Sequence, residues 1–213
     1  MSSIIAPSLD EAVEATQVRI GERPITFVQY LDLPDPNHEY ELTNGVLTKK
    51  MSAQLDHEYL QVWLLFVLTG FCHSRDMGVV LGSRTAVEVG MFGGRMPDLL
   101  FVSKARMKVV QQKAIFGPPD LVIEIVSPND RISGLRSLEA DYRSIGVSEI
   151  VFIDQHRAEI TVIRRRNDEY EVSTIRDGDL ILESVGNLTL RSEWILQVPR
   201  PDHYATLTGL LGG

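Results

Sequence analysis

The sequence has almost no cysteine and no long apolar segment, and each absence excludes a class of protein. Cys72 is the only cysteine, which excludes a disulfide-stapled domain, and no cluster of cysteine and histidine has the spacing of a zinc site. The longest apolar run, 62–68, is too short to cross a bilayer, so no membrane contact is expected. The first residues lack the basic start and apolar core of a signal peptide, and the expected compartment is the cytoplasm.

Positive charge is also scarce. The chain carries 29 acidic residues against 21 lysines and arginines, a net charge of −8. Surfaces that grip nucleic acid through its phosphates are usually basic, so this balance argues against a tight, general nucleic-acid binder. It leaves open a local basic groove or a bound cation that offsets phosphate charge. The best local basic patch is the segment 104–113, with four lysines and arginines, which either contacts a DNA backbone or is a solvated loop.

What is present fits one folded domain of mixed α/β type. The composition is 44% hydrophobic and 23% charged, and we predict an N-terminal arm over 1–23, a domain over 24–198 and a C-terminal tail over 199–213. Periodicity predicts helices, a hairpin and strands over the following ranges: helix 25–31, hairpin 39–50, helix 57–72 capped by Asp56, strands 79–89, 98–102 and 121–126, helix 133–145, strand 150–154, and short strands over 158–198. This order predicts a mixed sheet flanked by helices.

The hairpin has a strong local signal. The dipeptide Asn44-Gly45 lies between two alternating segments, and both of its residues tolerate a positive φ. A two-residue turn fixes the register, so that Glu41 faces Thr48 and Glu39 faces Lys50. We therefore expect these four side chains on one face of the ribbon.

Two acidic residues lie where ordinary core-building would not put them. Glu124 is centred in an otherwise apolar strand, and burying an unpaired carboxylate costs several kcal/mol. Asp98 opens another strand directly after Pro97. If the two strands are neighbours, both carboxylates could bind Mg²⁺ or Mn²⁺, with Glu41 as a third carboxylate from the hairpin. The alternative is that Glu124 meets an arginine or a sheet edge, Asp98 caps a turn and Glu41 is exposed.

Several segments together resemble the Uma-type endonucleases, a bacterial family of restriction-endonuclease-like fold in the PD-(D/E)XK superfamily. They are YELTNG at 40–45, RMPDLLFV at 95–102, PDLVIEIVSP at 119–128 and DYRSIGV at 141–147, with His57 opening a helix and Asp154 ending a strand. The resemblance covers about residues 25–190 and implies a restriction-endonuclease-like mixed sheet.

The resemblance also implies a site and an activity. Asp98 and Glu124 match the two acids that hold Mg²⁺ or Mn²⁺ in such nucleases, and Glu41 matches an early catalytic carboxylate. The implied reaction is hydrolysis of a phosphodiester bond in DNA by a metal-activated water. The implied partner is DNA, and we also expect the chain to form a homodimer.

One expected residue is missing. The superfamily places a lysine two residues after the second acid, which here is Val126, and Uma-type members commonly move it to a position that here is Leu138. Lys50, Arg131 and Arg136 are candidate substitutes, and each is otherwise a solvated surface cation. His57 either donates to a carboxylate near the site or lies in solvent.

Without that lysine we expect metal binding with weak or absent cleavage, and a gain on the order of 10²-fold from Leu138→Lys. The alternative function is a catalytically inactive nuclease-fold protein that binds nucleic acid or a partner as a homodimer.

Overall fold

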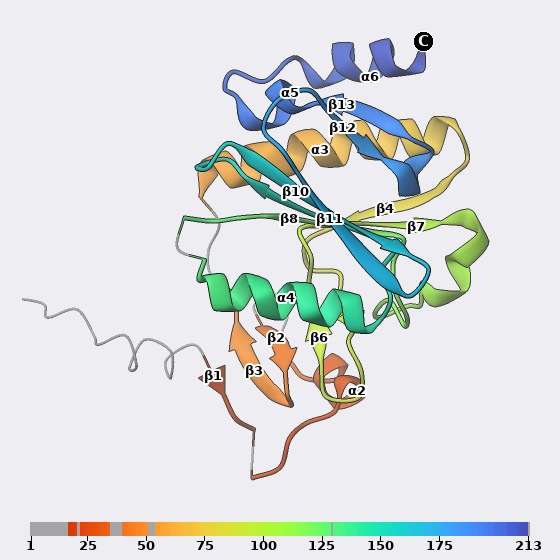
Figure 1. Cartoon of the computed structure of the whole chain (residues 1–213). Helices are drawn as coiled ribbons and strands as arrows, with labels where there is room; N and C mark the ends of the chain where they lie inside the picture. The colour runs from red at the N-terminus through yellow and green to blue at the C-terminus, as the bar shows by residue number, and fades with distance from the viewer. Residues whose placement is uncertain (1–16, 21, 35–39, 51–53, 129, 213) are drawn as a thin grey trace, which may run out of the picture.

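The computed structural model describes residues 17–20, 22–34, 40–50, 54–128 and 130–212 (Figure 1). Most of the predicted N-terminal arm and Glu39 of the hairpin lie outside the described residues. None of the helices in these ranges is long and apolar enough to cross a membrane.

The centre of the fold is a six-stranded sheet with the order β11-β10-β9-β8-β7-β4. Its strands are β4 (Gly78–Gly82), β7 (Leu99–Ser103), β8 (Leu121–Ile125), β9 (Glu149–Asp154), β10 (Glu159–Arg166) and β11 (Glu169–Ile175). Strands β8 and β9 are parallel, and helix α4 (Ile132–Ser144) makes the crossover between them. All other pairs in this sheet are antiparallel.

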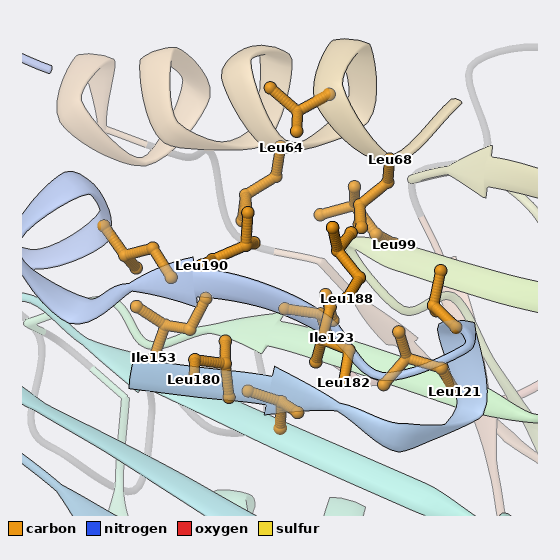
Figure 2. Close-up of a cluster of buried hydrophobic side chains, with 14 of the residues drawn as sticks. Leu64, Leu68, Leu99, Leu121, Ile123, Ile153, Leu180, Leu182, Leu188 and Leu190 are labelled. Carbon is orange, nitrogen blue, oxygen red and sulfur yellow. The ribbon is translucent and has the colours of Figure 1, made fainter. Parts of the chain in front are cut away.

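One face of the sheet is covered by α3 (Leu55–Ser74) and by the C-terminal elements. These are β12 (Asp179–Leu182), η2 (Glu183–Val185), β13 (Leu188–Arg191), α5 (Ser192–Leu196) and α6 (His203–Leu211). Figure 2 shows the resulting core, in which Leu64 and Leu68 of α3 lie over Ile123 of β8 and beside leucines of the β12–β13 hairpin. Burial of this apolar surface is the main favourable contribution to folding on this side.

The opposite face carries α4 and, beyond it, a second and smaller sheet (Figure 1). That sheet has the order β1-β3-β2-β6-β5 and packs around α2 (Phe27–Leu31). Its strands are β1 (Gln17–Val18), β2 (Tyr40–Thr43), β3 (Val46–Lys49), β5 (Val87–Glu88) and β6 (Gly94–Arg95). A short 3₁₀ helix, η1 (Lys104–Val109), follows β7. The mixed α/β fold with flanking helices is as predicted.

Helix α2 has a complete N-cap, and the predicted hairpin is confirmed. Thr26 caps α2 by accepting from the Gln29 N–H, and the Thr26 N–H donates to Oε1 of Gln29, which completes a capping box. Strands β2 and β3 pair through the Asn44-Gly45 turn, with Glu41 opposite Thr48.

Two predicted boundaries are wrong. The single strand expected over 79–89 is two strands in different sheets, β4 and β5, separated by a turn in which Arg84 has a φ of 80°. Helix α3 begins at Leu55 with Gln54 as its N-cap, so Asp56 lies inside the first turn. The short helices α5 and α6 were not predicted, and α6 lies within the segment 199–213 that the sequence assigns to a tail.

Candidate active site

Asp98 and Glu124 lie together on one face of the central sheet. Leu99 pairs with Ile123 across the antiparallel β7 and β8, and extending this register by one residue puts Asp98 opposite Glu124. Side chains opposite each other in an antiparallel pair share a face, about 4.5–5.5 Å apart at Cβ. The exposed fractions of the two residues are 4% and 7%, so two carboxylates are buried side by side.

Asp98 is surrounded by hydrogen-bond donors. Its Oδ2 accepts from the backbone N–H of Ile125 at 2.8 Å and lies 3.0 Å from Nε2 of His57, at the start of α3. Its Oδ1 lies 3.4 Å from Nζ of Lys50. Burial alone would raise the pKa of Asp98, but the His57 hydrogen bond, the Lys50 charge and the Ile125 N–H outweigh it, and the pKa is lowered. Asp98 is therefore a stable carboxylate.

Glu124 behaves in the opposite way. Its Oε1 accepts a hydrogen bond of 2.5 Å from the hydroxyl of Tyr142, on α4. Burial and the adjacent charge of Asp98 raise the pKa of Glu124 to about 8, against weaker opposing effects of Lys50 and Tyr142. Glu124 has a tyrosine as its hydrogen-bond partner rather than an arginine, and β8 lies inside the sheet rather than at its edge.

Glu41 lies beside this pair but is engaged with the backbone that leads to it. Its Oε1 accepts from the N–H of Met96 at 2.9 Å, and its Oε2 pairs with Arg95 at 3.1 Å. Arg95 also donates to Asp141 at 2.7 Å and to Ser137 at 3.0 Å, both on α4. Glu41 and Arg95 thus join the small sheet to α4, two to three residues before Asp98.

Lys50, which follows β3, reaches the carboxylates from the hairpin. Its Nζ donates to the carbonyl oxygen of Met96 at 2.5 Å and pairs with Asp98. Burial lowers the pKa of Lys50, but the charges of Asp98, Glu124 and Glu41 outweigh it and leave the pKa above its usual value. Lys50 is therefore a protonated donor at neutral pH.

The other candidate substitutes face solvent. Arg131 and Arg136 are exposed, and Leu138 is half-buried against the core beneath α4. In the basic segment, Lys104, Arg106 and Lys113 each pair with an aspartate, so their charge is already offset.

The carboxylate pair suits a small divalent cation. Mg²⁺ is bound in many enzymes by one or two carboxylates, with water and substrate phosphate supplying the remaining oxygens. Burial and the adjacent charge of Asp98 raise the pKa of Glu124, and a cation between the two carboxylates would favour its ionised form; Asp98 and Glu124 are the residues that would hold the ion. Over the described ranges, no group of three or more His, Cys, Asp or Glu side chains is arranged to hold a metal.

Two contributors escaped the sequence reasoning. Tyr142 lies in the predicted helix 133–145, and no sequence pattern links its hydroxyl to Glu124. Arg95 had a usable signal, since it is a charged residue beside the apolar strand opened by Asp98, and it is only 7% exposed.

A mixed sheet with a pair of acids on adjacent strands is the arrangement that the sequence resemblance predicts for a nuclease-like protein. The family model Uma2, described as "Putative restriction endonuclease", matches residues 27–197, and the chain belongs to this family. A crystal structure of a putative nuclease belonging to DUF820 from Anabaena variabilis ATCC 29413 has a similar fold, with a TM-score of 0.68 over 81% of this chain and 98% of that chain. The two sequences are 19% identical, so the likeness concerns the fold. A comparison with curated proteins gave no match.

Proposed function

We propose that the protein is a metal-dependent endonuclease that hydrolyses phosphodiester bonds in DNA at Asp98 and Glu124. The observation that carries the proposal is the pair of buried carboxylates on one face of β7 and β8, one ionised and one with a pKa raised to about 8. Two carboxylates buried side by side offer the oxygen ligands that Mg²⁺ and Mn²⁺ prefer, and membership of a nuclease family supplies the substrate class.

In the proposed reaction, the oxygen of a water forms a bond to phosphorus, and the bond from phosphorus to one ester oxygen breaks. The leaving oxygen receives a proton, so the products are a phosphate monoester and a hydroxyl group. Mg²⁺ or Mn²⁺ held by Asp98 and Glu124 would offset charge on the phosphate and acidify the water. His57 and the Ile125 N–H hold the Asp98 carboxylate in one orientation, and Tyr142 does the same for Glu124.

The first test is calorimetric titration of Mn²⁺ into the unmodified protein and into Asp98→Asn, followed by nicking of supercoiled plasmid. We expect at least a tenfold loss of Mn²⁺ affinity in Asp98→Asn, because one of two ligand carboxylates loses its charge. Asp76→Asn is the matched control, since Asp76 is exposed and pairs with Lys104 on the surface. Equal Mn²⁺ affinity in all three proteins would refute the proposed site.

The alternative, an inactive nuclease fold that binds nucleic acid or a partner, has specific support in Leu138, which stands where the family lysine is expected. The exposed apolar residues Leu55, Tyr59 and Val62 along α3 would suit a homodimer contact. Under this alternative Mn²⁺ binds, plasmid stays intact, and light scattering reports a dimer.

A further inference from the structure

We infer that Lys50 replaces the lysine that the family places on α4. From the hairpin, its ammonium group positions the attacking water and a phosphate oxygen. This inference rests on the proposed function, because it assigns a role at the same site. It concerns a positioning role for the ammonium group as a hydrogen-bond donor.

The ammonium group of Lys50 has both the location and the free capacity for this role. An ammonium group has three N–H donors, and over the described ranges two of them meet the carbonyl oxygen of Met96 and Oδ1 of Asp98. The Lys50 side chain is 33% exposed, whereas that of Asp98 is 5% exposed, so Lys50 connects the buried carboxylate with solvent. A substrate phosphate that approaches Asp98 therefore meets the Lys50 ammonium group.

The position of Lys50 is fixed by the fold. The hairpin register puts Lys50 and Glu41 on the same face, and the two side chains bind opposite sides of one residue. Glu41 accepts from the Met96 N–H and Lys50 donates to the Met96 carbonyl oxygen. Arg95 then ties this segment to α4. These bonds hold the hairpin against the strand that carries Asp98.

The helix offers a second route to the same place. Leu138 lies one turn before Tyr142 on α4, and residues four apart share a helix face. Tyr142 reaches Glu124 from that face, so a lysine at 138 would approach the carboxylates from α4. A lysine could therefore reach the carboxylates either from the hairpin or from α4. In this chain the lysine comes from the hairpin.

The experiment measures nicking of supercoiled plasmid in Mn²⁺ by the unmodified protein, Lys50→Ala, Leu138→Lys and the double variant. We expect Lys50→Ala to lose about 10²-fold in rate, the scale of one positioning or acid–base group. The double variant should regain at least tenfold, because the ammonium group returns from α4. Lys49→Ala, an exposed lysine on the other face of the hairpin, is the matched control and should nick at the unmodified rate.

Titration of Mn²⁺ shows whether Lys50→Ala loses activity because the positioning ammonium group is gone or because the protein is unfolded. Lys50→Ala should bind Mn²⁺ at least as tightly as the unmodified protein, because removing a positive charge beside Asp98 favours the cation. Lys50→Met, which keeps the apolar stem, replaces Lys50→Ala if the latter is unfolded by circular dichroism.

The outcomes distinguish this inference from the proposed function. Cleavage unchanged in Lys50→Ala, or a double variant that stays inactive while it binds Mn²⁺, overturns the role of Lys50 and leaves the nuclease proposal standing. An inactive unmodified protein beside an active Leu138→Lys also overturns it. If all variants are inactive and Mn²⁺ binding does not depend on Asp98, the proposed function itself fails.

Discussion

Two neighbouring carboxylates in this protein have opposite protonation behaviour, although they lie on paired strands. The difference follows from their donors: Asp98 has a backbone N–H, an imidazole and an ammonium group, whereas Glu124 has one neutral hydroxyl. Glu124 therefore bears most of the cost of burying two acids together, which is seen in its pKa of about 8.

This raised pKa predicts a pH dependence of stability that depends on Glu124. Between its ordinary value of 4.5 and about 8, the folded state keeps a proton that the unfolded state has lost. The proton on Glu124 thus contributes to the free energy of unfolding in full below pH 4.5. This contribution is lost as the pH rises through 8, at up to about 1.4 kcal/mol per pH unit. Urea unfolding in EDTA should show the unmodified protein losing on the order of 3–5 kcal/mol relative to Glu124→Gln between pH 5 and pH 8.

Glutamine keeps the size of Glu124 and an acceptor for Tyr142, so the comparison isolates the titrating proton. Glu169→Gln, on the exposed part of β11, is the control and should run parallel to the unmodified protein. A Glu124→Gln curve parallel to that of the unmodified protein would show that Glu124 keeps an ordinary pKa.

Which site residues the sequence can indicate depends on how local their signals are. Glu124 and Asp98 are visible because an acid in an apolar strand is rare, and Lys50 is visible through the hairpin register that links it to Glu41. Tyr142 is invisible because its role depends on how α4 docks across β8. For His57 the sequence allows either a hydrogen bond to a carboxylate or a position in solvent. Only the packing of α3 decides that its ring contacts Asp98.

At the scale of elements, the hairpin is the part of the site that sequence predicts best. Its Asn44-Gly45 turn adopts positive φ at both residues, 51° and 75°, as a two-residue turn requires. The division of 79–89 into β4 and β5 has a signal in Gly82 and Ser83, which are common turn residues. Alternation alone does not show it, because valines lie on both sides of the turn. Helix α6 was missed because its sequence contains Thr and Gly, and its stability comes from the Asp202 cap and from packing on α3.

The hairpin turn also gives a prediction about the site. A Cβ at Gly45 would lie 2.3 Å from Cβ of Pro24, and φ is +75°, so Gly45→Ala is both strained and sterically blocked. Gly90 has a similar φ of +70° with open space around it, so Gly90→Ala isolates the backbone cost of about 1–2 kcal/mol. Thermal unfolding should show Gly45→Ala to be less stable than Gly90→Ala by at least about 1 kcal/mol.

Plasmid nicking by the same two variants tests whether the hairpin positions Lys50. We expect Gly45→Ala to lose activity at temperatures where it is folded, because the displaced turn shifts the ribbon that carries Lys50 and Glu41. Gly90→Ala should retain activity. Equal activity per folded molecule in both variants would contradict a positioning role of the hairpin.

At the scale of the whole molecule, the site is assembled from parts that are far apart in the sequence. The small sheet contributes Lys50 and Glu41, the central sheet contributes Asp98 and Glu124, and helices on opposite faces contribute His57 and Tyr142. Local patterns in the sequence predict the elements one by one. The position of their side chains relative to one another is set by packing between the layers. From the sequence, only the family resemblance assigns these residues to one site.

The C-terminal helix α6 lies apart from the site. It packs on α3 and stabilises the fold there. The indole N–H of Trp63 donates to the carbonyl oxygen of Pro201 at 2.9 Å, and a Cβ at Gly70 would lie 2.3 Å from Leu207, so α6 packs closely on α3. None of the site residues lies in this region. Removing 199–213 should therefore cost stability while leaving the metal site intact.

We expect this truncation to lower the free energy of unfolding by about 2–4 kcal/mol, the scale of losing two partly buried leucines and one hydrogen bond. Tryptophan fluorescence should shift to longer wavelength as Trp63 becomes wet, and Mn²⁺ affinity should stay within about threefold, because the ligands lie on β7 and β8. In the full chain, Gly209→Ala should raise stability by about 0.5–1 kcal/mol, since Gly209 is helical and has open space around it. A truncated protein that keeps its full stability, or one that remains folded but no longer binds Mn²⁺, would contradict this division between support and site.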